Sequence, residues 1–358
     1  MIKALFDQLN KMKQKICPNL TEEMDKIKRC QNEFEKIEAK TFSEISELKK
    51  QRSDEKRARE RISKFSQNVE TGPDMENFMV DQLASTSLSN PITGFYGEES
   101  FTFSNCGMKG MFGPDLNKCI SSYHVEWVKN SDYFSMENRG IQKVKIPISA
   151  EFEFTAFGAG WMNYGAMAKA NIKLKNGTEI FIGIGQRGKT SFDGCGGTFV
   201  AIRENGKVIP IIIAGGAGGG NSEKEYGDGS DDQFGNRSSE IKERNRNIGK
   251  EGKSSDSHYY NGGNGFFGRI EGNWKQTETP KSFEDGLNGG KWKDDDYYEN
   301  YEGGFGGGGH GPNAGGGGYT GGHGGNYYGG GGGGSFTQNG KGIQKGHKDP
   351  GLLKIKIN

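Results

Sequence analysis

The sequence predicts an N-terminal α-helical coiled coil followed by an all-β region, a β-sandwich or barrel, with an inserted glycine-rich layer of polyglycine-II-type helices. Three observations lead to this fold class. Apolar residues recur at steps of three and four over residues 1–70, short runs of alternating apolar and polar residues follow residue 100, and 61 of the 358 residues are glycine. We expect a coiled coil over 1–70, a linker over 71–99 and a glycine-rich β domain over 100–358.

The N-terminal segment has a heptad-like apolar seam, with Lys, Glu and Gln on the other faces. The seam begins with Ile2, Leu5, Leu9, Met12 and Ile16. Pro18 interrupts the pattern, which predicts a short first helix and a long second helix that reaches about Gln67. A polar helix of this length needs a partner to cover its seam, so we expect a homo-oligomeric coiled coil. A helix folded back onto the C-terminal domain is the alternative.

From residue 101 the apolar period changes to two, most clearly at Phe152 and Phe154, and Gly, Asn or Pro separates the runs. Many short strands without a helical pattern between them indicate an antiparallel sandwich or barrel. The segment 221–260 is charged and nearly without aliphatic residues, so we expect a mobile excursion there. No structure is predicted for 272–300. The expected strands are 101–103, 123–128, 141–148, 151–157, 172–174, 179–184, 198–202, 208–213 and 352–357.

The glycine-rich stretch 301–336 differs from a flexible linker because aromatic residues punctuate it. These residues are Phe305, Tyr319, Tyr327 and Phe336. Extended glycine helices have no internal hydrogen bonds, so each must bond to neighbours of its own kind, which other glycine runs of the chain can supply. Stacking between molecules is the alternative, as in a self-assembling fibre or coat. The glycines expected in this layer include Gly215, Gly216, Gly218, Gly306, Gly307, Gly315, Gly316, Gly331 and Gly332.

One stretch, GIGQRGKT at 183–190, matches the phosphate-loop pattern GxxxxGK[ST] and follows a β-run. In a phosphate loop, Lys189 would reach the terminal phosphates and Thr190 would hold magnesium. That chemistry needs a helix beginning at the lysine, whereas the next residues, TSFDGCGGTFV, do not have a helical pattern. Nucleotide binding at 183–190 is therefore a minor alternative.

The sequence predicts no catalytic site, no metal site and no cofactor. His310 and His323 lie in the glycine stretch without a carboxylate or cysteine at a ligand spacing. The net charge of +1 gives no support for nucleic-acid binding, and no run of about eighteen apolar residues indicates a membrane span. Cys106 and Cys119 flank a short Gly/Pro-rich turn and are candidates for a disulfide, if the compartment is oxidising.

An ordered series of motifs runs from about residue 101 to residue 358. The series is FTFSNCGMKGMFGPDLNKC, GIQKVKIPISAEFEFTAFGAG, TEIFIGIGQRG, GGTFVAIRENGKVIPIIIAGGAGGG, GGFGGGGHGPNAGGGGY and the closing LLKIKI. In this order it resembles the glycine-rich extracellular domain of the anaplastic lymphoma kinase and leukocyte tyrosine kinase receptors. The resemblance implies a tumour-necrosis-factor-like (TNF-like) β-sandwich interrupted by a bundle of glycine helices, a contribution to binding protein ligands, and a bridge between Cys106 and Cys119. It also implies that GQRG ends a β-run.

Together these features favour a non-enzymatic binding module, multimerised by its coiled coil, that engages an unidentified protein or glycan. The self-assembling fibre or coat is the alternative from a different class. The start of the sequence has no uninterrupted apolar run typical of a secretory signal, which makes a cytoplasmic location the default expectation. The family resemblance implies the cell surface or the extracellular space instead.

Overall fold

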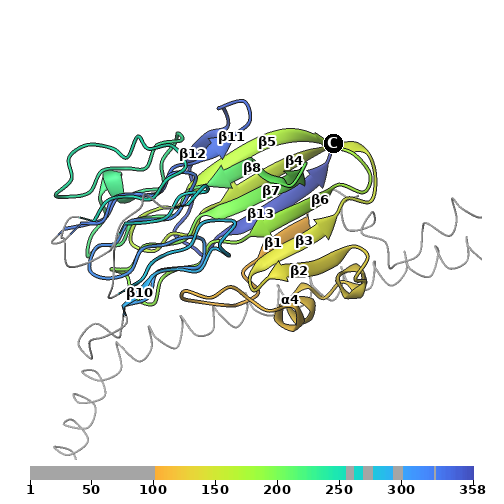
Figure 1. Ribbon diagram of the computed structural model, residues 1–358, viewed down its shortest axis with the longest axis horizontal. Helices are drawn as coiled ribbons and strands as arrows, with labels where there is room; N and C mark the ends of the chain where they lie inside the picture. Colours follow the sequence, from red (N-terminus) through yellow and green to blue (C-terminus); the bar gives the residue numbers. More distant parts are fainter. Residues whose placement is uncertain (1–100, 255–261, 269–276, 293–300, 326–327) are drawn as a thin grey trace, which may run out of the picture. The chain divides into compact units, whose positions relative to one another are not determined.

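The computed structural model describes residues 101–254, 262–268, 277–292, 301–325 and 328–358. The chain divides into two units between Asp81 and Gln82, and all described residues belong to the second unit. They form two large antiparallel sheets, a two-stranded ribbon, a short α-helix and long glycine-rich segments (Figure 1).

The predicted fold class is wrong as stated. The described residues are mostly β-structure and include a single short α-helix, α4 (Leu116–Tyr123). The coiled coil predicted for 1–70 and the linker predicted for 71–99 lie outside the described residues. Two antiparallel sheets with a shared apolar core give the described region a β-sandwich architecture.

The first large sheet is five-stranded. Buried residues alternate with exposed or partly exposed ones along β5, because one face of the sheet meets the core and the other meets solvent. The last strand, β13, pairs with both β1 and β4, so the C-terminal segment lies inside the sheet. The strands in spatial order are β1 (Phe101–Ser104), β13 (Leu352–Ile357), β4 (Ala150–Phe157), β5 (Ala166–Leu174) and β12 (Ile343–Lys345).

The second large sheet is six-stranded and more completely buried. Burial is continuous over 198–201 and over 210–214, as expected when both faces of a strand are covered. Its strands in spatial order are β11 (Phe336–Thr337), β8 (Lys207–Ala214), β7 (Thr198–Glu204), β6 (Glu179–Gly183), β3 (Ile141–Lys145) and β2 (Phe134–Asn138). The two-stranded ribbon consists of β9 (Thr277–Glu278) and β10 (Lys291–Trp292).

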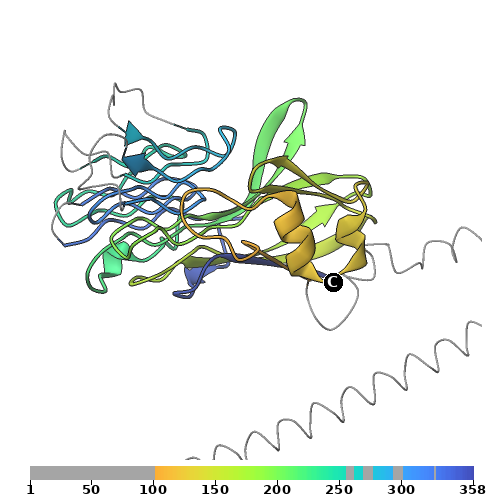
Figure 2. The ribbon, with the colours of Figure 1, turned by 90° about the horizontal axis from the view of Figure 1, so that it is seen from below.

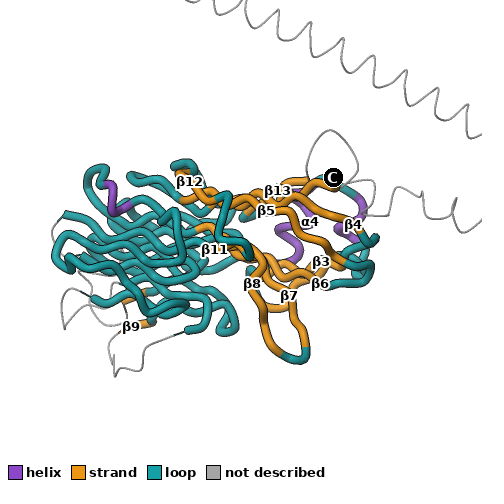
Figure 3. The backbone as a smooth tube through the Cα atoms, turned by 90° about the horizontal axis from the view of Figure 1, so that it is seen from above, coloured by secondary structure: helices purple, strands orange, loops and turns teal. Residues whose placement is uncertain are grey.

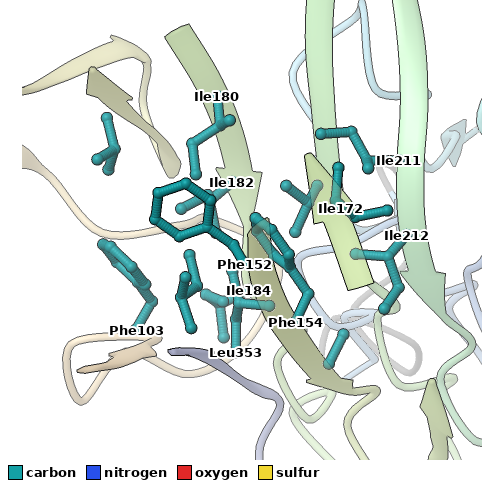
Figure 4. Packing of buried hydrophobic residues seen from close by; sticks show 14 of the residues in the cluster. Phe103, Phe152, Phe154, Ile172, Ile180, Ile182, Ile184, Ile211, Ile212 and Leu353 are labelled. Carbon is teal, nitrogen blue, oxygen red and sulfur yellow. The ribbon is translucent and has the colours of Figure 1, made fainter. Parts of the chain in front are cut away.

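The main core lies between the two large sheets (Figure 4). Phe152 and Phe154 of β4 pack in one cluster with Ile180 and Ile182 of β6 and with Leu353 of β13. All five side chains are fully buried. Burying a side chain of this size stabilises the folded state by about 1.5–3 kcal/mol, so apolar burial holds the two sheets together.

The other face of the six-stranded sheet is covered by aromatic side chains from the glycine-rich segments. Phe181 and Phe199 of the sheet share a second apolar cluster with Phe266, Phe283 and Phe305. The ring centroids of Phe199 and Phe266 are 6.3 Å apart, and those of Phe266 and Phe283 are 5.2 Å apart. The six-stranded sheet therefore lies between two apolar clusters, which is why its strands β7 and β8 contain long buried apolar runs.

The strand predicted at 123–128 is absent. These residues are the end of α4 and a 3₁₀ helix, η1 (Glu126–Lys129). Asp115 caps α4 by accepting a hydrogen bond from the backbone N–H of Lys118 at 2.8 Å, a start signal that the prediction overlooked. The short strands β2, β9, β10, β11 and β12 were not predicted either. The remaining predicted strands overlap observed ones.

Strands β7 and β8 form a hairpin that projects beyond the sandwich (Figure 2). Its turn residues Asn205 and Gly206 both have positive φ, at 51° and 75°. An Asn-Gly pair adopts this conformation readily and matches the twist of the two strands. Glu204 and Lys207 face each other across the turn.

Beyond one end of the sandwich, the glycine-rich segments run side by side as neither helix nor strand (Figure 3). Backbone hydrogen bonds join them. Gly216 N–H donates to Gly317 O at 2.8 Å. Gly316 N–H donates to Gly331 O at 2.9 Å, and Gly331 N–H donates to His323 O at 2.7 Å. Paired amides, rather than a side-chain core, hold these segments together. We call these segments the glycine layer; they comprise the glycine runs at 194–197, 215–220 and 262–265 and those in the described parts of 303–334.

The segment 221–260 is predicted to be a mobile excursion, but its described part, 221–254, packs against the glycine layer. It contains a short 3₁₀ helix, η2 (Glu225–Gly227). The side chain of Asn245 is buried, and its Nδ2 donates to Gly321 O at 2.8 Å. Polar side chains such as Asn245 can be buried in this segment because they donate hydrogen bonds to glycine carbonyls. A polar composition is therefore compatible with close packing.

Cys106 and Cys119 form a disulfide between the loop after β1 and helix α4, across 13 positions of sequence. Replacing both residues with alanine should lower the free energy of unfolding by about 2–4 kcal/mol, because the unfolded chain regains the entropy of the closed loop. Urea unfolding of both proteins, with and without a reductant, measures this difference. The reductant should destabilise the natural protein alone. Equal unfolding free energies without reductant would contradict the prediction.

Close packing in the glycine layer predicts unequal costs for two Gly→Ala substitutions. A Cβ on Gly316 would lie 2.2 Å from the carbonyl oxygen of Gly216, whereas a Cβ on Gly220 would meet its nearest atom at 3.5 Å. Gly316→Ala should therefore destabilise the protein by about 1–3 kcal/mol through overpacking. Gly220→Ala, the matched control, should cost much less. If both variants lose a similar amount of unfolding free energy in thermal or urea unfolding, the glycine segments are not in close contact.

Candidate ligand-binding site

The stretch 183–190, which matches a phosphate loop, is engaged in internal hydrogen bonds. Gly185 N–H donates to Thr198 Oγ1 at 3.1 Å. Lys189 N–H donates to Glu302 O at 2.8 Å. Bends and turns follow the lysine, with no helix whose N-terminus could add amides. These N–H groups are therefore not available to cradle a phosphate.

A buried carboxylate lies in the turn that follows. Asp193 accepts hydrogen bonds from the N–H and the hydroxyl of Thr190 at 2.8 and 2.9 Å, and from Gly311 N–H at 3.1 Å. Burial raises the pKa of Asp193 to about 7, although these hydrogen bonds oppose the rise. The Thr190 hydroxyl donates to this carboxylate, so the contact that a phosphate loop would make with magnesium is replaced by an internal hydrogen bond. The geometry is that of a structural turn.

The buried histidines and the free cysteine lie inside the glycine layer. Burial lowers the pKa of both His310 and His323 to about 4. His323 Nδ1 accepts a hydrogen bond from Lys253 N–H at 2.8 Å. Burial raises the pKa of the Cys195 thiol to about 12, so it is a packing group rather than a nucleophile. Within the described ranges, no group of three or more His, Cys, Asp or Glu residues could hold a metal ion.

An open pocket of about 450 Å³ lies between the segment 225–244 and strand β12. The glycine layer supports its wall through backbone hydrogen bonds. Gly332 N–H donates to Tyr226 O at 2.9 Å, and Asn236 N–H donates to Gly332 O at 2.8 Å. The pocket is thus built on a framework of paired amides. Its charged lining comprises Glu225, Asp228, Asp231, Arg237, Arg244 and Lys345.

Two cations of the lining are already paired with carboxylates. Arg244 donates to both carboxylate oxygens of Asp232, at 2.9 and 2.6 Å. Lys345 Nζ lies 2.8 Å from Asp228 Oδ2 and 4.0 Å above the ring of Tyr164. Both pairs are partly exposed, so each contributes modestly to stability. Their main effect is to fix the shape and the charge pattern of the pocket.

Three charged residues of the lining remain available to a ligand. Arg237 lies over the ring of Tyr226, with its guanidinium carbon 4.5 Å from the ring centroid. Within the described part of the chain, no carboxylate forms an ion pair with Arg237, and no cation forms one with Glu225 or Asp231. The pocket therefore presents one cation and two anions on a supported wall.

The residues singled out from the sequence mostly lie away from this pocket. Phe305 and Tyr319 are buried in the second apolar cluster, Phe336 is partly buried against Tyr319 at 4.6 Å, and Tyr327 lies outside the described residues. Gly332 touches the wall of the pocket through the hydrogen bonds above. Gly331 lies against the same wall, since a Cβ on it would be 2.2 Å from Asn236 O. The other predicted glycines are buried within or beside the layer, namely Gly215, Gly216, Gly218, Gly306, Gly307, Gly315 and Gly316.

The pocket residues are not among the candidates from the sequence, because a mobile excursion is expected over 221–260. A usable signal was present in EYGDGSDDQFGNR, where charges of both signs are interleaved with aromatic residues and glycine. A segment of that composition next to glycine runs can supply side-chain donors for exposed glycine carbonyls. Composition alone does not distinguish such a segment from a solvated loop.

Comparison with known protein families gives no match to any family model. Among the residues that the structure describes, no helix has the length and apolar character needed to cross a membrane.

The depressed pKa of His323 predicts a loss of stability in acid. Between pH 6.5 and about 4 the unfolded chain binds a proton at this residue that the folded chain does not, so stability falls as pH falls through this window. His323→Asn keeps an acceptor for Lys253 N–H and removes the titration. Relative to the natural protein, the variant should gain about 1–3 kcal/mol between pH 6.5 and 4. Urea unfolding at several pH values measures this gain.

The matched control is His124→Asn, at the exposed C-terminal end of α4, where asparagine suits the left-handed backbone. It should leave the acid loss of stability in place. A His323→Asn variant with the same pH dependence as the natural protein would show that His323 is not buried as described.

Proposed function

We propose that the described region is a non-enzymatic binding module that holds part of a protein or glycan ligand at the charged pocket. The supporting observation is the pocket itself, in which Arg237, Glu225 and Asp231 have no ion-pair partners among the described residues. A concave site of a few hundred cubic ångströms with a small number of directed polar groups is typical of ligand binding.

The family resemblance supports the same proposal. The motif series from residue 101 to residue 358 is similar to the glycine-rich extracellular domain of the anaplastic lymphoma kinase and leukocyte tyrosine kinase receptors, which contributes to binding protein ligands. We propose that this region is a domain of that kind, working by recognition rather than by catalysis. A cell-surface or extracellular location belongs to the same proposal.

The alternatives have weaker support. A fibre or coat built by glycine stacking between molecules would need backbone groups free to pair with a neighbour, whereas the amides of Gly216, Gly316 and Gly331 pair within the chain. Nucleotide binding would need free amides and a helix after Lys189, and the geometry there provides neither among the described residues. Binding at the pocket requires only groups that are at least partly exposed, namely Glu225, Asp231 and Arg237.

The test is a search for ligands with the full-length protein. Arrays of extracellular protein domains and of glycans are probed with the natural protein, with Arg237→Glu, and with Lys207→Glu. The last variant is the matched control because Lys207 is exposed at the tip of the β7–β8 hairpin. At least one ligand should bind the natural protein and the control equally and bind Arg237→Glu about tenfold more weakly, because reversing one charge of a hydrogen-bonded pair costs more than 1 kcal/mol.

Arrays that yield no ligand would count against the binding module. Ligands that bind all three proteins equally would show that the binding surface lies outside the pocket. Circular dichroism and thermal melting of Arg237→Glu show that any loss of binding is not a loss of folding.

A further inference from the structure

We propose that the charged pocket takes a peptide segment of a partner protein that bears a basic and an acidic side chain close together, in preference to a glycan. This inference rests on the proposed function and names the ligand class of the same site. Three features of the pocket support it. Its unpaired charges have both signs, its neighbouring aromatic rings are already covered by cations, and the side-chain oxygen of Asn236 can accept a hydrogen bond.

The unpaired charges have both signs. Arg237 needs an anion, while Glu225 and Asp231 need a cation, and the two Lys/Arg–Asp pairs of the lining leave no net charge to add to them. A ligand of a single sign would satisfy the residues of one charge and be repelled by those of the other. A peptide with neighbouring Lys or Arg and Asp or Glu side chains satisfies both. A neutral sugar satisfies neither charge.

The aromatic rings beside the pocket already carry cations. Arg237 covers one face of Tyr226 at 4.5 Å, and Lys345 lies 4.0 Å from the ring centroid of Tyr164. A Cβ built on Gly329 would lie 3.4 Å from Cε2 of Tyr226, so the backbone also approaches the edge of that ring. Rings engaged in this way are poor platforms for the apolar face of a pyranose. The contact with Tyr226, together with a hydrogen bond from Arg237 Nη1 to Ser238 O at 3.4 Å, orients the Arg237 guanidinium, which favours recognition of a carboxylate.

One polar side chain of the pocket can recognise a peptide backbone. Asn236 lines the pocket, and its Nδ2 donates to the carbonyl oxygen of Asp228 at 2.9 Å. No described residue donates to its side-chain oxygen, which can therefore accept a hydrogen bond from a ligand N–H. A peptide supplies such a donor at every residue except proline.

The experiment measures fluorescence anisotropy of labelled probes with the full-length protein. The probes are three decapeptides, alternating Lys and Asp, Lys and Ser, or Asp and Ser, and two oligosaccharides, one neutral and one sulfated. The proteins are the natural chain, Arg237→Glu, Asp231→Lys and the double reversal. The Lys/Asp peptide should bind the natural chain at least about tenfold more tightly than any other probe. Each single reversal should weaken it about tenfold.

The double reversal is the decisive control. Arg237→Glu together with Asp231→Lys keeps one unpaired cation and two unpaired anions, Glu225 being unchanged, and exchanges a positive and a negative position. The alternating peptide can shift by one residue to match. Binding should therefore recover in the double variant. Loss that persists there would indicate damage to the fold and would overturn the charge-pattern argument.

The remaining outcomes separate the ligand class from the proposed function. Equal or tighter binding of a single-sign peptide, or of either oligosaccharide, would overturn the mixed-charge peptide while leaving the binding module intact. If none of the probes binds at millimolar concentration, the mixed-charge peptide proposal is also overturned. The array search with Arg237→Glu then decides independently whether the pocket binds a ligand of another class.

Discussion

The structure depends on backbone hydrogen bonds between glycine segments that at most positions are too close together for a side chain. Such a layer has almost no apolar surface of its own to bury, and each glycine loses more conformational freedom on folding than any other residue. Two contributions offset that cost. Donors such as Gly216 and Gly316 find partners within the chain, and the aromatic residues spaced along the segments pack against the six-stranded sheet. The layer and the sandwich therefore stabilise each other.

This arrangement explains how a weakly apolar segment can form the wall of the charged pocket. The segment 225–244 has few aliphatic residues, but its backbone is tied to Gly332 and its side chains are tied to one another, as in the Arg244–Asp232 pair. With the wall fixed in this way, the remaining charges can stay exposed in one geometry. Preorganised groups of this kind lose less entropy when a ligand binds.

Sequence reasoning predicted most of the sandwich and little of the site. Strong alternation marks strands such as β4, and the glycine runs are plain in the sequence. Apolar periodicity does not reveal helix α4, because the helix is short and its few apolar residues lie beside a run expected to be a strand. Asp115 at its N-cap is a sequence signal for its start. The phosphate-loop match at 183–190 shows the limit of short patterns, since only the structure reveals that its amides are already bonded. The pocket could not be predicted, because it forms only when the polar segment 225–244 packs beside β12, which lies about 100 residues later in the sequence.

Hydrogen exchange of individual glycine amides tests the central claim most directly. If the layer is held by paired amides and folds with the sandwich, the N–H groups of Gly216, Gly316 and Gly331 should exchange as slowly as those in the middle of β4 and β6, through global unfolding. If these glycines exchange at the rate of an unstructured peptide while the strands remain protected, the glycine segments are not a packed layer, and the support for the pocket is absent.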